Sequence, residues 1–237
     1  GGRRAPFYRD IEWLVNWSQE GREIKTALNA SGRVRSNVWM LADTASRFFF
    51  RPGITWPLRG STFSAQAVPQ GSIFSVAGKM AFVPEDDLLV SLGLFNSRVF
   101  DGFIAFFAGK VGGVQYEVGV IQKIPFPTNV QEKVRSEVDS LSRRGWHSQR
   151  KLDSYSEISH VFSGSYPQEI RKVSLSELHL GLASHLEGIL KELTTIQEQI
   201  DVCAFDMYSV SSSDRESILA TLGSMSSVGM NTEDDIN

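Results

Sequence analysis

The chain has 237 residues, of which 41% are hydrophobic and 22% charged, and its formal net charge is −3. These values exclude a disordered or fibrous chain and leave room for one or two domains, each with its own core. A single cysteine, Cys203, excludes a disulfide framework and a thiolate metal cluster. The sequence shows no signal peptide and no apolar run near the ~18 residues that a membrane helix needs, so we expect a cytoplasmic protein without membrane contact.

Charge is unevenly divided along the chain. Residues 1–127 contain 14 Lys and Arg against 10 Asp and Glu, a net charge of +4, whereas residues 128–237 contain 10 against 17, a net charge of −7. Ten of the basic residues precede position 60, and nine of those ten are arginine. An arginine-rich half is compatible with nucleic-acid binding, and an ordinary solvated surface explains the same count.

The first part of the chain predicts short strands and turns. Partial alternation of apolar and polar residues predicts a strand at 11–17, and a short helix follows at 19–28. After a polar loop, the turn Arg51-Pro52-Gly53 leads to short strands at 54–56, 65–68, 72–76 and 81–83. This spacing predicts a curved sheet or partial barrel. A strong strand so near the first residue also suggests that the chain is cut from a longer protein.

From residue 86 the apolar residues recur at helical spacing. They predict two helices between 86 and 107, with a break or cap at Asn96-Ser97. A strand at 114–120 then leads to Lys123-Ile124-Pro125-Phe126-Pro127, whose prolines can continue neither a helix nor a central strand. Further helices are predicted at 130–141, 155–162 and 175–206, and the capping-box spacing of Ser213 and Glu216 predicts one more.

Together these elements predict an α+β fold in two domains. Residues 1–127 would form a β-rich domain, with a curved, mostly antiparallel sheet or partial barrel and short helices. Residues 128–237 would form a helical bundle or spacer with a frayed C-terminal tail.

Signatures of catalysis are absent from the sequence. It has no phosphate-binding loop, no dinucleotide-binding glycine motif, no zinc-ligand spacing and no nucleophile–His–Asp signature. Glu85-Asp86-Asp87 precedes a predicted helix, where carboxylates suit the helix dipole; the alternative is a magnesium site in a free-standing nuclease. We expect no catalytic, cofactor or metal residues in this chain.

A binding role therefore has the stronger support. Arginine offers a planar fork that fits guanine edges and phosphates, and loops on a rigid sheet often carry recognition residues. A solvated surface group is the alternative for each polar candidate, and a core residue is the alternative for Trp56. The candidates for contact with double-stranded DNA are Arg33, Arg35, Arg51, Thr55, Trp56, Arg59, Ser61, Lys79 and Lys110, and Arg47 lies among them in the sequence.

Several short segments occur in a distinctive order between Tyr8 and about Ile218. They are Tyr8-Arg9-Asp10, Val15-Asn16-Trp17, Gly21-Arg22-Glu23-Ile24-Lys25, Phe50-Arg51-Pro52-Gly53-Ile54-Thr55-Trp56, Gly71-Ser72-Ile73-Phe74, Leu92-Gly93-Leu94-Phe95-Asn96-Ser97, Tyr116-Glu117-Val118-Gly119-Val120, Lys123 to Pro127, Ile196 to Asp201 and Ala204 to Tyr208. The set resembles the C-terminal specificity region of adenine-specific DNA methyltransferases of the BREX phage-defence kind. It is also similar to type IIG restriction–modification enzymes, in which a methyltransferase is fused in the same chain.

The resemblance implies a target-recognition domain followed by a helical spacer. In such proteins the methyltransferase domain is N-terminal, carries an Asn-Pro-Pro-Tyr type motif and binds S-adenosylmethionine; neither that motif nor the cofactor's glycine-rich strand end occurs here. The implied partners are duplex DNA, the methyltransferase domain of the same polypeptide and other defence-system proteins. The alternative function is a protein-interaction module, in which the acidic helical half docks another defence-system subunit.

Overall fold

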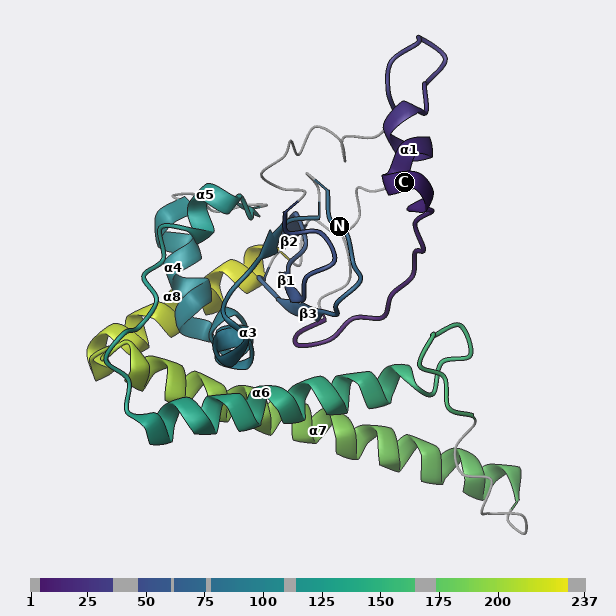
Figure 1. The fold of residues 1–237 in the computed structure, drawn as a ribbon. Coiled ribbons are helices and arrows are strands. Elements are labelled where there is room, and N and C mark those ends of the chain that lie inside the picture. Colours follow the sequence, from purple (N-terminus) through teal and green to yellow (C-terminus); the bar gives the residue numbers. More distant parts are fainter. Residues whose placement is uncertain are drawn as a thin grey trace.

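A computed structural model gives the architecture of the chain (Figure 1). It describes residues 5–35, 47–60, 62–75, 78–108, 114–164 and 174–229. The strands are β1 (Gly53–Thr55), β2 (Arg59–Gly60), β3 (Gln66–Val68), β4 (Met80–Ala81) and β5 (Val114–Gln115). The helices are α1 (Ser18–Thr26), the 3-10 turn η2 (Glu85–Asp87), α3 (Leu88–Phe95), α4 (Arg98–Ala108), α5 (Val118–Ile121), α6 (Glu132–Asp153), α7 (Leu175–Met207) and α8 (Ser212–Gly229).

The sheet is small, antiparallel and open. β1 lies between β3 and β4, with Ile54 opposite both Ala67 and Ala81. β2 and β5 form a separate antiparallel pair, in which Arg59 lies opposite Gln115. Short strands beside long helices confirm the predicted α+β class.

The corner between α3 and α4 lies at the predicted break. Asn96 ends α3, and the Ser97 hydroxyl donates to the Leu94 carbonyl at 2.7 Å. The first N–H of α4, from Arg98, donates to the Asp201 carboxylate of α7 at 2.7 Å. A side chain from a distant helix therefore satisfies an N–H group that lacks a partner within α4.

α6 and α7 form a long antiparallel hairpin, on which α3 packs, and β1 of the sheet contacts α3 (Figure 1). α7 begins with a capping box in which the Ser174 and Glu177 side chains bond each other's backbone N–H groups. α3 crosses α6 closely, because Gly93 faces Val138 and Ser142 of α6 without a side chain between them. The helix predicted from Ser213 and Glu216 exists as α8, but the capping hydroxyl is that of Ser211, which accepts the Asp214 N–H at 3.2 Å.

One contiguous hydrophobic core connects the sheet with the helical hairpin. It includes Trp56 and Phe63 from the first half, Leu92 from α3, Val138 from α6 and Ile196 from α7. The core thus continues across residue 127, where the sequence changes from short strands to long helices.

Four segments differ from the sequence-based expectation. Residues 11–17 join no strand; at the two ends of this segment the Asp10 and Asn16 side chains accept the backbone N–H groups of Ile11 and Ser18. Residues 72–75 are irregular, and residues 155–162 form turns in place of a helix. The predicted strand at 114–120 ends after β5: Val118–Ile121 instead makes a single helical turn that carries Ile121 into the core.

No single helix in the described part of the chain is both long and apolar enough to cross a membrane. Glu85–Phe95 and Arg98–Ala108 reach that length and composition only as a pair bent by 75°. The apolar side chains of this pair largely belong to the core, among them Leu92, Leu94, Val99 and Phe100.

Candidate nucleic-acid interface

The nine candidate residues lie in several parts of the fold. Arg33 and Arg35 follow α1 in a turn that projects away from the sheet (upper right in Figure 1). Arg51 and Thr55 lie beside and within β1, and Arg59 lies in the separate β2–β5 pair. Ser61 and Lys110 lie outside the described residues. The fold does not gather the seven described candidates into one cleft.

Trp56 takes the core role that the sequence left open for it. Its side chain is 3% exposed, and the indole Nε1–H donates to the Tyr116 carbonyl at 3.0 Å. Its ring packs near Phe63 and Phe95. Because both its apolar surface and its hydrogen-bond donor are used inside the fold, Trp56 is withdrawn as a DNA contact.

Lys79 is likewise used inside the fold. Its ammonium donates to the Glu117 carboxylate at 2.7 Å and to the Tyr116 carbonyl at 3.4 Å, while its own backbone carbonyl accepts the Thr55 hydroxyl at 2.7 Å. The hydrogen bond from Lys79 holds the pKa of Glu117 below its usual value. A buried, paired lysine cannot reach phosphate without leaving Glu117, so we also withdraw Lys79.

The four remaining arginines are exposed, and none has a carboxylate partner among the described residues. Arg51 lies over the rings of Phe48 and Phe82, with its guanidinium carbon 5.1 Å and 5.8 Å from their centroids. Arg59 donates to Gln115 at 3.2 Å. Arg33 is positioned through its backbone N–H, which donates to the Asn29 side chain at 2.9 Å.

Two more arginines share this property. Arg22 on α1 and Arg47 at the start of the turn before β1 are also exposed, and neither has a carboxylate partner in the described part of the chain. Arg22 was missed as a site residue because a charged residue on a short predicted helix is usually just part of its solvent-exposed face. Its lack of a partner is visible only in three dimensions.

Residues 10–17, which we call the strap, cover a groove beside the sheet. The groove has a volume of about 710 Å³ and is lined by the strap and by residues 68–75, together with Phe50, Thr55, Gly78 and Met80. On the strap, Trp13 is 82% exposed and Leu14 97% exposed. The sequence predicted a strand here and therefore half-buried side chains, so this exposed pair was missed.

The N-terminal end of the strap is fixed to the sheet and to the loop after α6. Three residues before the strap, Phe7 exchanges backbone hydrogen bonds with Ala65 and Ala67 at 2.8 and 3.0 Å. The Asp10 carboxylate accepts the His160 N–H at 3.2 Å and pairs with the His160 ring. Burial alone would raise the pKa of Asp10, but hydrogen bonds from Ser159 and His160 outweigh it and hold that pKa below its usual value.

The other end of the strap is fixed by aromatic packing. The Trp17 ring meets the edges of Phe49 and Phe50, with centroids 5.4 and 5.6 Å apart, and the Lys25 ammonium lies 5.5 Å from the Trp17 ring. Gly21 has φ +73°, and a Cβ there would lie 2.9 Å from the Trp17 ring. Both the backbone conformation and the close approach of the ring therefore favour glycine at this position. With both ends held, the exposed side chains in the middle of the strap are presented from a fixed support.

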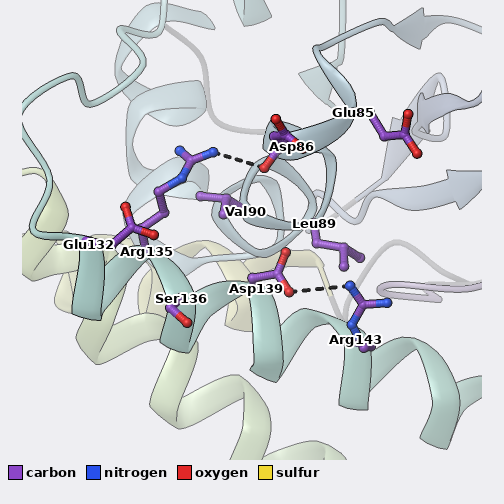
Figure 2. Close-up of a pocket in the computed structure, with 9 residues that line it drawn as sticks. All are labelled: Glu85, Asp86, Leu89, Val90, Glu132, Arg135, Ser136, Asp139 and Arg143. Carbon is purple, nitrogen blue, oxygen red and sulfur yellow. Dashed lines mark hydrogen bonds and ion pairs between the residues drawn. The ribbon is translucent and has the colours of Figure 1, made fainter.

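A second groove, between η2, α3 and α6, has the opposite character (Figure 2). It measures about 560 Å³, and its carboxylates outnumber its arginines. Arg135 donates to the Asp86 carbonyl at 2.9 Å and pairs with Asp87, and Arg143 pairs with Asp139 at 3.5 Å. Its cations are thus paired, and the groove repels phosphate.

The acidic residues at the start of α3 have a structural role. Asp87 is held by Arg135, and the turn Glu85–Asp87 leads directly into α3. Within the described residues, no group of three or more His, Cys, Asp or Glu side chains is placed to hold a metal ion.

No protein-family model matches this chain, and no curated protein matches it.

Proposed function

We propose that this chain is a DNA-recognition region, which binds duplex DNA through its arginine-rich first half and positions it for chemistry in another domain. By the resemblance described above, that domain is an adenine-specific methyltransferase of the BREX or type IIG kind, which carries the catalytic residues and S-adenosylmethionine. In this proposal the present chain contributes recognition, and its place of action is the cytoplasm.

The observation that carries the proposal is a contrast in arginine pairing. Of the described arginines in the helical half, Arg135, Arg143 and Arg144 have a carboxylate partner within 3.5 Å, and Arg150 and Arg215 lie over aromatic rings. In the first half Arg9 pairs with Glu12, but six exposed arginines lack such a partner among the described residues; they are Arg22, Arg33, Arg35, Arg47, Arg51 and Arg59. An unpaired guanidinium can bind phosphate in a bidentate manner without first breaking an ion pair.

The distribution of acidic groups supports the same orientation. The acidic groove between α3 and α6 disfavours DNA on that side, whereas α1, the turn after it and the turn before β1 carry arginines without a carboxylate partner among the described residues. DNA would therefore approach the side formed by α1, the strap and the edge of the sheet. Arg59, on the separate β2–β5 pair, would mark the limit of that contact.

Salt-dependent binding tests the proposal directly. We would measure fluorescence anisotropy of a labelled 30-base-pair duplex with the whole chain at several salt concentrations. An Arg33→Glu/Arg35→Glu/Arg51→Glu variant would be compared with Lys133→Glu/Lys151→Glu/Lys191→Glu, which changes net charge equally on exposed sites of the helical half.

Because each phosphate contact contributes ~0.9 to the slope of log K against log salt, losing three contacts should flatten the slope by about 2.7 and weaken binding markedly. The lysine variant should keep the wild-type slope. Equal losses in the two variants, or binding by the unaltered chain that does not respond to salt, would contradict the proposal.

A second function has its own supporting observation. On α7, Leu175, Leu180 and Leu190 are 82%, 67% and 54% exposed, and Ile158 in the preceding loop is 97% exposed. Exposed apolar groups of this size are typical of protein contact surfaces. The hairpin of α6 and α7 could thus dock another defence-system subunit while the sheet half serves only as support. Pull-down of such a subunit that is lost in Leu175→Glu/Leu180→Glu/Leu190→Glu, together with no salt-dependent DNA binding, would favour this function.

A further inference from the structure

The strap presents two large apolar side chains where the fold does not need them. Trp13 and Leu14 are 82% and 97% exposed, and both line the groove beside the sheet. Both ends of the strap are fixed, by Asp10 on His160 and by Trp17 on Phe49 and Phe50. Solvent exposure of such side chains has a cost, so a held, exposed pair indicates a contact with another molecule.

The groove has the size and lining of a site for a flat, mostly apolar group with polar edges. About 710 Å³ lies within the range of small-molecule sites. Its walls combine the Phe50, Phe74 and Met80 side chains with the polar side chains of Gln70 and Ser72. A nucleobase combines an aromatic face with hydrogen-bonding edges in the same way.

The surrounding charge favours a polyanion as the carrier of that group. The acidic side chains of the strap have partners, since Glu12 pairs with Arg9 at 2.8 Å and Asp10 accepts hydrogen bonds from His160. The segments at either side add cations without carboxylate partners among the described residues: Lys25 over the Trp17 ring, and Arg22, Arg47 and Arg51. Aromatic side chains beside unpaired cations are the combination with which proteins hold unstacked nucleotides.

We propose that the strap is a base-stacking element: Trp13 and Leu14 contact an unstacked base of the bound DNA, and the groove beneath the strap accepts that base. The inference rests on the proposed DNA-binding function and names the part of the DNA that this surface reads. Apolar side chains inserted beside base steps and aromatic rings stacked on extruded bases both have this effect.

The test uses the whole chain and 20-base-pair duplexes that carry 2-aminopurine at the centre. In one duplex this base is correctly paired with thymine, and in the other it faces an abasic site, so that it leaves the stack easily. Trp13→Ala/Leu14→Ala would be compared with Ile158→Ala/Leu175→Ala, a control pair in which Ile158 and Leu175 are 97% and 82% exposed. Trp13→Phe keeps an aromatic ring and serves as the conservative variant.

The unaltered chain should bind the abasic duplex about tenfold more tightly than the paired one and should change its 2-aminopurine fluorescence, because one stacked side chain contributes roughly that factor. The strap variant should lose both effects and keep salt-dependent binding to the paired duplex, whereas the control pair and Trp13→Phe should retain them.

If the strap variant binds both duplexes as the unaltered chain does, with the same fluorescence, the inference is wrong while the DNA-binding function stands. If the unaltered chain binds neither duplex, both are wrong. Binding of Trp13 and Leu14 to vesicles of anionic phospholipid, with no 2-aminopurine response, would assign the strap to a membrane surface and would also overturn the inference.

Discussion

Asn96 at the corner of α3 and α4 offers a sharp test of how this fold is held together. Its side chain is buried and makes three hydrogen bonds: Oδ1 accepts the Ala65 N–H at 2.9 Å, and Nδ2 donates to the Ala65 carbonyl at 3.0 Å and the Leu92 carbonyl at 2.9 Å. The amide therefore joins the chain just before β3 to the end of α3. We predict that Asn96→Ala strongly destabilises the protein.

The free-energy cost of Asn96→Ala depends on which backbone groups keep another hydrogen-bond partner when the Asn96 side chain is removed. The Ala65 carbonyl keeps a second donor, the Phe7 N–H at 2.8 Å, and the Leu92 carbonyl keeps the Asn96 N–H at 3.3 Å. The Ala65 N–H loses its side-chain acceptor in a buried position, which costs about 1–3 kcal/mol. Two further lost hydrogen bonds add about 1 kcal/mol each, so the total loss is about 3–5 kcal/mol. That is a large part of the ~5–15 kcal/mol that stabilises an ordinary domain.

Urea denaturation of Asn96→Ala and Asn29→Ala measures this difference. The Asn29 side chain also makes three hydrogen bonds, to Ser31 and Arg33, but in an exposed turn where water can replace it. Asn29→Ala should therefore cost below ~1 kcal/mol. Similar losses in the two variants would mean that burial of the Asn96 bonds does not set their value, and the reasoning would be wrong.

Three further predictions concern single contacts. Gly93→Ala should lower the free energy of unfolding by about 1 kcal/mol or more in urea, because its Cβ would lie 2.7 Å from the Val138 side chain. Asp201→Ala should lower the melting temperature by removing the cap of α4, at a cost of about 1 kcal/mol. Asp201→Asn keeps an acceptor for the Arg98 N–H and should remain near wild type, since burial, which raises the pKa of Asp201, disfavours its charged form. The pKa of Asp10 is lower in the folded chain than its ordinary 3.8, so the contact with His160 stabilises the fold above pH 3.8, and this stabilisation is lost as the pH falls below 3.8. Urea denaturation of wild type and Asp10→Asn from about pH 7 to about pH 3 should therefore show a stability difference that shrinks at the acidic end. A difference that stays constant over this range would contradict the reasoning.

The helices could be predicted from sequence where their apolar spacing is long and regular. The α3–α4 pair and α7 were placed within a few residues, since many buried positions support the same period. α6 extends to Asp153, well beyond the predicted end at 141, because polar residues after Leu141 are tolerated on its exposed face. The length of α6 thus depends on which of its faces is exposed to solvent, and the spacing of residues in the sequence does not reveal this.

The strap and α5 could not be predicted, because short β-branched and aromatic runs look alike in strands and in anchored coil. Trp13, Leu14 and Val15 match a strand by composition, yet the nearby side chains of Asp10 and Asn16 bond the backbone locally. The same limit applied to the candidate site. The arginines could be counted from the sequence. Whether an arginine has a carboxylate partner, as Arg135 does and Arg33 does not among the described residues, depends on residues far apart in sequence.

The structure also explains why the sheet half depends on the helical half. Phe7, which leads into the strap, is 1% exposed and packs where Gly145 of α6 has no side chain, since a Cβ there would lie 2.9 Å from the Phe7 ring. Tyr8 meets the edge of Trp146 on the next position of α6, with centroids 5.6 Å apart. The surface proposed to read DNA is thus positioned by α6 of the helical half. A chain ending at residue 127 would lose these supports, so the arginine and strap variants have to be tested in the whole chain.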